Sequence, residues 1–133
     1  ETRHIAGEYV LSKDDVYNAR SFDDRVVKDA YFNFDVHNVD GAGLDKTGMQ
    51  KKYVQKKGYD IPYRSLLPKK TENLMLAGRC ISGTHMAHSN YRAMPICFAM
   101  GAAAGAACLV SVSENTPLKE LDVKSVQKEI KVF

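Results

Sequence analysis

The sequence contains few cysteines, and their number and spacing argue against a disulfide scaffold. Only three are present, Cys80, Cys97 and Cys108. An odd set without Cys-x-x-Cys spacing is not the pattern of a small chain held together by disulfides. Cys97 and Cys108 lie in an apolar stretch, where cysteine acts as a small hydrophobic residue. We therefore expect all three cysteines to serve mainly in packing.

A strong charge of either sign is also missing. The 19 lysines and arginines exceed the 16 aspartates and glutamates by a formal net charge of +3. Much of the excess comes from one polar stretch that contains Lys46, Lys51, Lys52, Lys56 and Lys57. This stretch has few aromatic residues and no nucleic-acid-binding motif, so it predicts a solvated loop and no nucleic-acid partner.

Long hydrophobic runs are rare, and the longest uncharged run lies in the last third of the chain. Residues 93–110 carry no charge. Such a run reaches the lower length limit of about 17 residues for a membrane-spanning helix. It is, however, mostly alanine and glycine, has Pro95 near its start and follows a polar stretch. We therefore expect a helix buried in a soluble protein, and no membrane span.

The stretch from residue 73 to residue 110 predicts a strand, a loop and this long helix. Residues 74–77 are apolar on both faces, as a central parallel strand is when other elements cover both its sides. The strand ends at Gly78, and a polar loop separates it from Pro95. Proline suits the first turn of a helix, where its missing N–H would have no partner.

The predicted helix has two properties that favour a binding role. Its N-terminal end offers unpaired N–H groups and the positive end of the helix dipole to an electron-rich group. In addition, Gly101, Gly105 and the alanines between them leave one face almost without side chains. Another backbone or a flat ligand could approach that face closely. A core helix that binds nothing would show the same pattern, so both interpretations stay open at this point.

The remainder of the chain alternates short strands and helices, which predicts an α+β fold with mixed or antiparallel strands. Strand patterns cover residues 4–11, 25–37 and 59–67. Ser12 followed by Asp15 matches a capping box, so a short helix is expected from residue 13 to about residue 20. Asp122 can cap a last amphipathic helix.

Several segments, in the same order along the chain, resemble one family. The run NLMLAGRCISGTHMAHSNYRAMPICFAMGAAAGAA is similar to the closing FAD-binding segment of flavoproteins with the glutathione-reductase-like dinucleotide fold. Upstream, ETRHIAGEYVLSKDDV, FDVHN and IPYRSLLPK resemble the FAD-dependent oxidoreductase family often found in bacterial genomes, some of whose members are labelled xanthan lyases. These segments cover most of residues 1–111. The resemblance implies an FAD cofactor and says little about the substrate.

One motif of such flavoproteins is missing from the sequence. They open with a strand, a Gly-x-Gly-x-x-Gly turn and a helix. Here Gly41-Ala42-Gly43 is followed by Lys46 where a third glycine would stand, and the chain begins at Glu1. We therefore expect the C-terminal part of a longer, two-domain oxidoreductase. Its parts would be a substrate-binding region (1–70), the closing strand, loop and buried helix of the FAD-binding domain (71–112) and a helical tail (113–133).

The resemblance implies that two neighbouring segments contact FAD. The turn at residues 78–79 stands where relatives have a glycine and a polar residue near the ribityl and pyrophosphate groups. The helix start at residues 94–98 would direct backbone N–H groups, those of Ile96, Cys97 and Phe98, at the flavin ring. The expected cofactor-binding residues are Gly78, Arg79, Ile81, Ser82, Met94, Pro95, Ile96 and Cys97.

The resemblance also places the loop with His85 and His88 at the border between flavin and substrate, where an imidazole can exchange a proton near neutral pH. Asp35 and His37 lie on one side of a predicted strand, and a carboxylate can fix the tautomer of an adjacent ring. These four are the expected catalytic residues, although each could instead be structural. Further groups that could hold an anionic or hydroxyl-rich substrate are Arg3, Tyr63, Arg64 and Arg92.

The expected function is hydride transfer from a small organic substrate, with a carbohydrate-related one as a candidate, to the flavin. The isolated 133-residue chain is expected to be inactive, because it needs the N-terminal remainder of the same protein. Two alternatives remain: a non-catalytic binding or oligomerisation module that uses the bare helix face, and a metal-dependent lyase or hydrolase that uses His85, His88 and Asp35. Compartment, electron acceptor and substrate do not follow from these residues.

Overall fold

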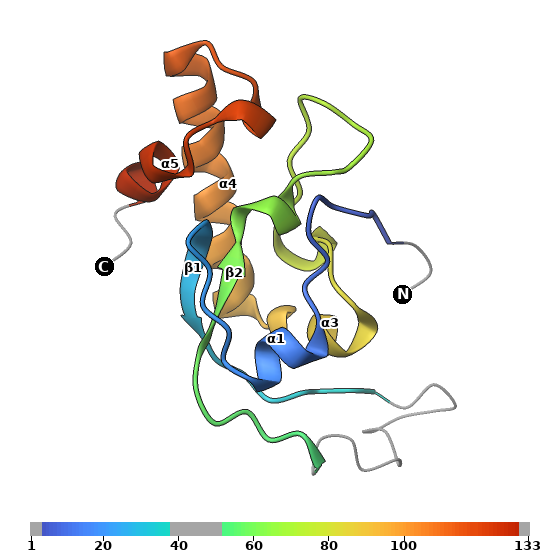
Figure 1. Ribbon diagram of the computed structural model, residues 1–133. Coiled ribbons are helices and arrows are strands. Elements are labelled where there is room, and N and C mark those ends of the chain that lie inside the picture. Colours follow the sequence, from blue (N-terminus) through green and yellow to red (C-terminus); the bar gives the residue numbers. More distant parts are fainter. Residues whose placement is uncertain (1–3, 38–51, 131–133) are drawn as a thin grey trace.

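The computed structural model describes residues 4–37 and 52–130 (Figure 1). In these residues a two-stranded antiparallel sheet is surrounded by helices, which confirms the α+β class. The helices and strands are α1 (Lys13–Tyr17), β1 (Arg25–Ala30), β2 (Tyr59–Pro62), α3 (His85–Tyr91), α4 (Met94–Glu114) and α5 (Val123–Ile130). The described ranges also contain three short 3-10 turns, η1 (Tyr63–Leu66), η2 (Gly78–Cys80) and η3 (Leu118–Glu120).

The capping box at the start of α1 forms as the sequence predicts. The Ser12 hydroxyl accepts a hydrogen bond from the Asp15 N–H at 3.2 Å, and an Asp15 carboxylate oxygen accepts from the Ser12 N–H at 2.8 Å. Both partners thereby satisfy N–H groups that a helix start leaves unpaired. The helix ends at Tyr17, earlier than expected, because the chain reverses through a left-handed Ala19 with φ of 52°.

The hairpin of β1 and β2 is shorter than the strand patterns predicted. Its register pairs Arg25 with Pro62 and Ala30 with Tyr59, with irregularities between these pairs. Residues 31–36 belong to no strand, and His37 makes only an isolated bridge, which corrects the expected strand over residues 25–37. Beyond Pro62 it tightens into η1, where the Ser65 hydroxyl donates to the Pro62 carbonyl at 2.7 Å. The expected strand over residues 59–67 therefore ends at the proline.

The N-terminal segment does not form the expected strand over residues 4–11. It is extended, and it meets the rest of the molecule through two isolated bridges, Gly7 to Pro68 and Leu11 to Gly83. Gly7 must be a glycine here, since a Cβ at this position would lie 2.7 Å from the Cβ of Ser82. The segment therefore packs between the loops that contain Pro68 and Gly83, and it does not extend the sheet.

Residues 74–78 are not a strand, and the loop expected after them is partly helical. Leu76 donates its N–H to the Leu66 carbonyl at 2.8 Å, but the described residues contain no neighbouring strand that could complete a ladder here. Helix α3 then begins after Thr84, whose hydroxyl accepts from the Ala87 N–H at 3.4 Å. A threonine cap at this position was the sequence signal for α3, and the polarity of the stretch concealed it.

Helix α4 has the expected length, with a proline in its first turn and Asn115 in the left-handed region at its end. It is buried along one face only, where its buried residues are Ile96, Met100, Ala103, Ala107 and Val110. The other face exposes large apolar side chains, among them Phe98 with 74% and Val112 with 82% of its surface accessible. Helix α5 begins as predicted, with the Asp122 carboxylate accepting from the Lys124 N–H at 3.0 Å.

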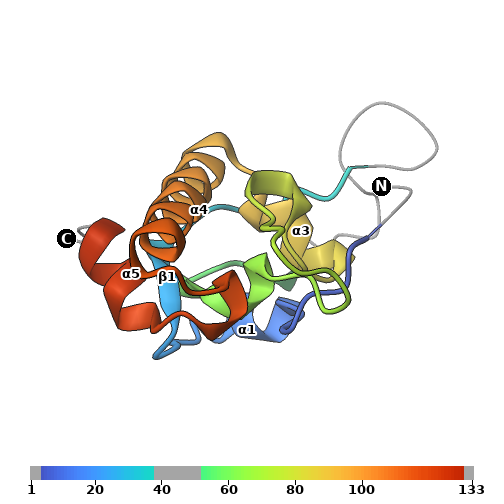
Figure 2. The same ribbon diagram turned by 90° about the horizontal axis from the view of Figure 1, so that it is seen from above.

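The core joins segments from all three expected parts of the chain. Seen from above, α4 runs along one side of the hairpin and α1 lies on the other side (Figure 2). The Tyr63 hydroxyl donates to the Leu118 carbonyl at 2.8 Å. The Gln127 side-chain amide donates to the carbonyls of Asp23 at 2.9 Å and Arg25 at 2.8 Å. The C-terminal segment is therefore packed into the fold and holds the outer edge of β1.

Candidate functional site

Turn η2 packs directly against the first turns of α4. Gly78 has a φ of +59°, and a Cβ built on it would lie 3.6 Å from the Cβ of Cys97. The turn thus lies beside the Cys97 side chain, and its left-handed backbone conformation is one that glycine adopts readily. Burial raises the pKa of the Cys97 thiol, while the Arg79 guanidinium partly opposes that shift. Arg79 itself is exposed at the surface.

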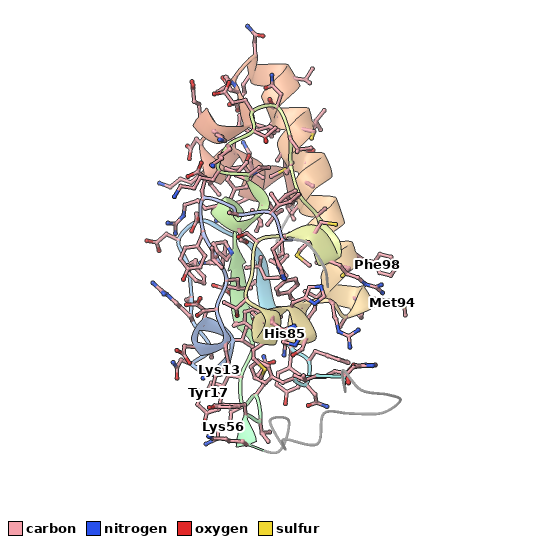
Figure 3. All side chains as sticks on the ribbon, turned by 90° about the vertical axis from the view of Figure 1, so that its right-hand side faces the viewer. Lys13, Tyr17, Lys56, His85, Met94 and Phe98 are labelled. Atoms are coloured by element: carbon pink, nitrogen blue, oxygen red, sulfur yellow. The ribbon has the colours of Figure 1, made fainter. Side chains whose placement is uncertain are left out.

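The N-terminal end of α4 is open to solvent and has no side-chain cap. Its N-cap residue is Ala93, which offers no hydrogen-bonding side chain. Cys97 donates its N–H to the Ala93 carbonyl at 2.9 Å, so of the expected donors only Ile96 lies before the intrahelical ladder begins. Met94 is 66% exposed and carries the other N–H of this end; Figure 3 shows it near Phe98 at the start of α4. An electron-rich group could bind at such an end.

Ile81 and Ser82 lie inside the molecule. Their exposed fractions are 3% and 2%. The Ser82 N–H donates to the Ser65 carbonyl at 2.9 Å, and its own carbonyl accepts from the Leu11 N–H at 3.0 Å. The structure therefore brings Gly78, Arg79 and residues 94–97 together, although the Ile96 side chain is buried, and places Ile81 and Ser82 in the core.

Helix α3 carries the two predicted histidines. His85, His88 and Arg92 follow one another at spacings of three and four residues, so they share one face of the helix. His85 is exposed (Figure 3). The His88 ring meets the buried Tyr91 ring edge to face, with the ring centres 5.2 Å apart. Because α3 leads into α4 through Arg92 and Ala93, this face lies close in sequence to the open end of α4.

Asp35 and His37 are brought together as predicted, even though the segment is not a strand. His37 Nε2 lies 3.0 Å from Asp35 Oδ2. The same carboxylate oxygen accepts from Arg92 Nη2 at 2.7 Å, and the Asp35 N–H donates to the Ser89 carbonyl at 3.2 Å. These bonds fix the Asp35–His37 pair to the C-terminal end of α3. Arg92, which the sequence suggested only as a possible substrate contact, is the residue that makes this attachment.

A buried amide network that the sequence did not reveal holds α3 in place. Asn90 is fully buried; its Oδ1 accepts from the Tyr59 hydroxyl at 2.9 Å. Its Nδ2 donates to Gln55 Oε1 at 2.8 Å and to the Phe32 carbonyl. Because Gln55 also donates to the Ala30 carbonyl at 2.9 Å, three segments are fastened to α3. Burial raises the pKa of Tyr59 far above its ordinary value, so its hydroxyl stays protonated as the donor.

Two further findings bear on the alternatives. Within residues 4–37 and 52–130, His, Cys, Asp and Glu side chains form no group of three that could hold a metal ion. His85, His88 and Asp35 are thus not gathered as ligands.

Among the described helices, α4 alone is long and apolar enough to cross a membrane, and 28% of its most apolar window is buried in the fold.

Comparison with known proteins identifies the family. The sequence model of the FAD-dependent oxidoreductase family matches residues 1–130. No curated protein and no solved structure gives a significant match to the chain. Since the family match covers nearly the whole sequence, the chain belongs to the FAD-dependent oxidoreductase family, whose cofactor is FAD.

Proposed function

We propose that this chain supplies the part of an FAD-dependent oxidoreductase that meets the flavin ring, with the open end of α4 facing the ring. Turn η2 would lie beside it, toward the ribityl and pyrophosphate groups. The observation that carries this proposal is the contact between Gly78, in the left-handed region, and Cys97 in the first turns of α4. Because of this contact, the glycine turn and the uncapped start of α4 are neighbours on one surface, where both could approach a cofactor.

The residues present fit such a cofactor. The N–H groups of Met94 and Ile96 precede the intrahelical ladder of α4, and Ala93 cannot cap them with its side chain. A helix end of this kind stabilises negative charge nearby by roughly 0.3–2 kcal/mol. Arg79 is exposed beside it and has the planar fork that suits a phosphate. Ile81 and Ser82 are buried, so the proposal does not assign them a contact with FAD.

When bound, FAD would accept a hydride from an organic substrate. The protein groups suited to proton transfer are His85, His88 and His37. Asp35 is held by Arg92 at 2.7 Å and lies 3.0 Å from His37. The Asp35 carboxylate thus lies between the Arg92 guanidinium and the His37 ring, where it can orient the imidazole. We assign His37 and the α3 histidines to the substrate side of the site.

We further infer that the chain works as the C-terminal part of a longer protein with a glutathione-reductase-like dinucleotide fold, similar to the bacterial group that includes proteins labelled xanthan lyases. Two observations support this inference. The sequence lacks a Gly-x-Gly-x-x-Gly turn, and the outer face of α4 leaves Phe98, Leu109 and Val112 uncovered. The remainder of the chain would cover that face and supply the phosphate-binding turn.

The placement of the flavin ring can be tested with two substitutions at the N-cap. Ala93→Asp and Ala93→Asn both give α4 a capping side chain, but only the aspartate adds a negative charge beside the ring. In the full-length flavoprotein, the aspartate variant should have a more negative flavin midpoint potential than the asparagine variant. Equal potentials in the two variants, with FAD bound to both, would refute this placement.

A binding or oligomerisation module remains a second candidate, favoured by one observation. A Cβ added at Gly101 or Gly105 would meet no atom within 4 Å, so the bare face of α4 is open to another backbone. Light scattering on the full-length protein, with and without Gly101→Leu, would decide: loss of self-association in the variant would favour the module, and an unchanged monomer would exclude it.

A further inference from the structure

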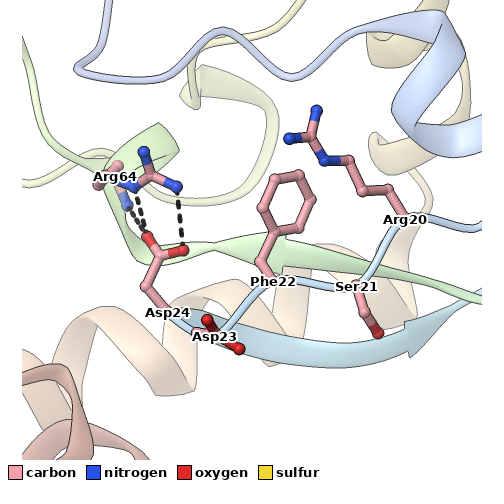
Figure 4. A pocket seen from close by; sticks show the side chains of 6 residues that line it. All are labelled: Arg20, Ser21, Phe22, Asp23, Asp24 and Arg64. Carbon is pink, nitrogen blue, oxygen red and sulfur yellow. Dashed lines mark hydrogen bonds and ion pairs between the residues drawn. The ribbon is translucent and has the colours of Figure 1, made fainter.

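A second polar surface lies on the side of the hairpin away from α4. An open hollow of about 440 Å³ is formed where the chain enters β1 and η1. Figure 4 shows the Phe22 side chain between Arg20 on one side and the Asp24–Arg64 pair on the other. The residues around the hollow are Arg20, Ser21, Phe22, Asp23, Asp24 and Arg64.

Arg64 is held in a fixed orientation at one side of this hollow. Its Nε donates to Asp24 Oδ2 at 2.8 Å, and its Nη2 donates to Asp24 Oδ1 at 3.2 Å. Its Cζ also lies 5.2 Å from the centre of the Tyr9 ring. This paired geometry uses one edge of the guanidinium group and leaves Nη1 outside the contact with Asp24.

Arg20 is held at the other side by different partners. Its Nη1 donates to Asp15 Oδ1 at 2.9 Å and to the Tyr9 hydroxyl at 3.0 Å. Its Cζ lies 4.9 Å from the centre of the Phe22 ring and 5.9 Å from that of Tyr9. None of these contacts uses Nε or Nη2. Both arginines are thus ordered by the protein while still presenting donors, with side-chain exposures of 56% for Arg20 and 49% for Arg64.

We propose that this hollow binds the oxyanion of a small molecule, a carboxylate or a phosphate, between Arg20 and Arg64. Guanidinium groups recognise such groups through charge-assisted hydrogen bonds, and prior ordering lowers the entropic cost of binding. Tyr9 lies close to both arginines and keeps them around the same space. The proposal does not depend on flavin binding, because the hollow and the open end of α4 lie on different sides of the hairpin.

The carboxylates around the hollow limit which ligands can bind. Asp24 is already paired with Arg64, and Asp15 is paired with Arg20. Asp23 is exposed and adds a further negative charge at the rim. It opposes a bound anion, so its removal should strengthen binding. This variant measures the repulsion by Asp23, and a substitution of equal charge in another segment measures the general effect of net charge.

The test is calorimetric titration of the full-length protein at low ionic strength. Inorganic phosphate is the ligand in one arm and acetate in the other. Preference between the arms identifies the anion class. Arg20→Gln should weaken binding about tenfold, in line with the loss of a charge-assisted hydrogen bond. Asp23→Asn should strengthen binding about twofold through reduced charge repulsion. Lys70→Gln, an equal charge change in a different segment, should leave binding unaltered.

Arg64→Lys is a control for loss of folding, because it keeps the positive charge at this position and removes only the planar guanidinium group. It should weaken binding while the circular dichroism spectrum stays unchanged. Absence of binding by the parent chain in both arms would overturn the proposal. Equal weakening by Arg20→Gln and Lys70→Gln would also overturn it. A flavin-loaded and a flavin-free sample should give the same anion affinity, which keeps this result separate from the outcome at the flavin site.

Discussion

At the scale of single residues, the buried polar side chains determine where the irregular segments lie. Asn90 is surrounded by the Tyr59 hydroxyl, the Gln55 amide and the Phe32 carbonyl. A buried amide of this kind is tolerated only when its donors and acceptor are paired. In the described residues, no buried side-chain nitrogen or oxygen lacks a partner. Asn90 therefore ties the irregular segments at Phe32 and Gln55, together with the start of β2, to α3.

Asn90→Ala should be among the most destabilising single changes in the chain. It removes a fully buried side chain and the partner of Tyr59, so the free energy of unfolding should fall by about 2–4 kcal/mol. Urea denaturation measures this change. Asn33→Ala is the matched control, because Asn33 is exposed. Similar losses in the two variants would contradict the central role of the network.

Asp15 gives the fold a defined sensitivity to acid. Burial alone raises the pKa of this carboxyl, but hydrogen bonds from Ser12, Arg20 and Tyr9 outweigh burial and bring the pKa below its ordinary value of 3.8. Because the folded-state pKa is the lower one, the stabilisation is complete above the unfolded-state pKa. It is lost as pH falls through the folded-state pKa.

Asp15→Asn should consequently lower the free energy of unfolding by about 1–3 kcal/mol at pH 7. The difference from the parent chain should shrink in acid, below about pH 4. Thermal melts at a series of pH values would measure it. Asp14→Asn serves as the control, since its neighbour Lys13 is a surface partner at 3.3 Å. A difference that stayed constant down to pH 2 would rule out this linkage.

At the scale of elements, local signals in the sequence predicted the helices better than the strands. Caps at Ser12 and Asp122 and the proline at the start of α4 each act within one turn, so the sequence alone is sufficient to locate them. Strands need partners from elsewhere in the chain. Residues 74–77 have the composition of a central strand, yet in the described residues they pair only through Leu76 with Leu66. Only Leu76 of this segment is buried, and Leu74 is 44% exposed, so the apolar pattern predicted neither the pairing nor the burial of the segment.

In the candidate site, too, local features could be predicted from the sequence, whereas contacts between distant segments could not. The alternation of residues 32–37 was sufficient to place Asp35 beside His37, and the proline indicated the open end of α4. The role of Arg92 could not be predicted, because its contact with Asp35 joins residues 57 positions apart. The burial of Ser82 depends on Gly7, far away in sequence. Such pairings arise from tertiary packing, which no local pattern encodes.

The bare face of α4 offers a test at the same scale. A Cβ at Gly101 or Gly105 would meet no atom within 4 Å, so Gly101→Ala with Gly105→Ala should stabilise the isolated chain by about 1–2 kcal/mol through helix propensity. Chemical denaturation would measure the gain. By contrast, Gly83→Ala should destabilise the chain, because its Cβ would lie 2.6 Å from the Tyr91 ring.

The same double substitution reports on the complete protein. If another segment packs closely on this face in the full-length protein, the added methyl groups will cause steric overlap, and the gain will turn into a loss. A gain of equal size in both contexts would show that nothing packs against these glycines. It would also count against the proposed cover for α4.

At the scale of the whole molecule, the described residues share one continuous core, which is separate from the proposed flavin contacts. The core runs from Leu11 to Val126, whereas the proposed flavin contacts lie at one exposed end of α4. The phosphate-binding turn that provides much of the grip on a dinucleotide is not present in this sequence. Folding and cofactor binding should therefore be separable properties of these residues.

We accordingly expect the isolated 133-residue chain to bind FAD weakly or not at all, and to show no oxidoreductase turnover. Absorbance near the flavin bands after gel filtration would measure retained cofactor, and the full-length protein is the positive control. Purification of the isolated chain with stoichiometric flavin would contradict this expectation. It would mean that α4 and η2 contribute more of the affinity than we infer.

The contact between Gln127 and β1 has a consequence for biosynthesis. Its amide satisfies the carbonyls of Asp23 and Arg25, which precede it by 104 and 102 residues. At ordinary translation speeds, roughly 5–20 s separate the appearance of these groups on the ribosome. During that interval the strand edge is unprotected and can pair with other nascent chains. Slow or interrupted translation before residue 127 should therefore favour misassembly over native folding.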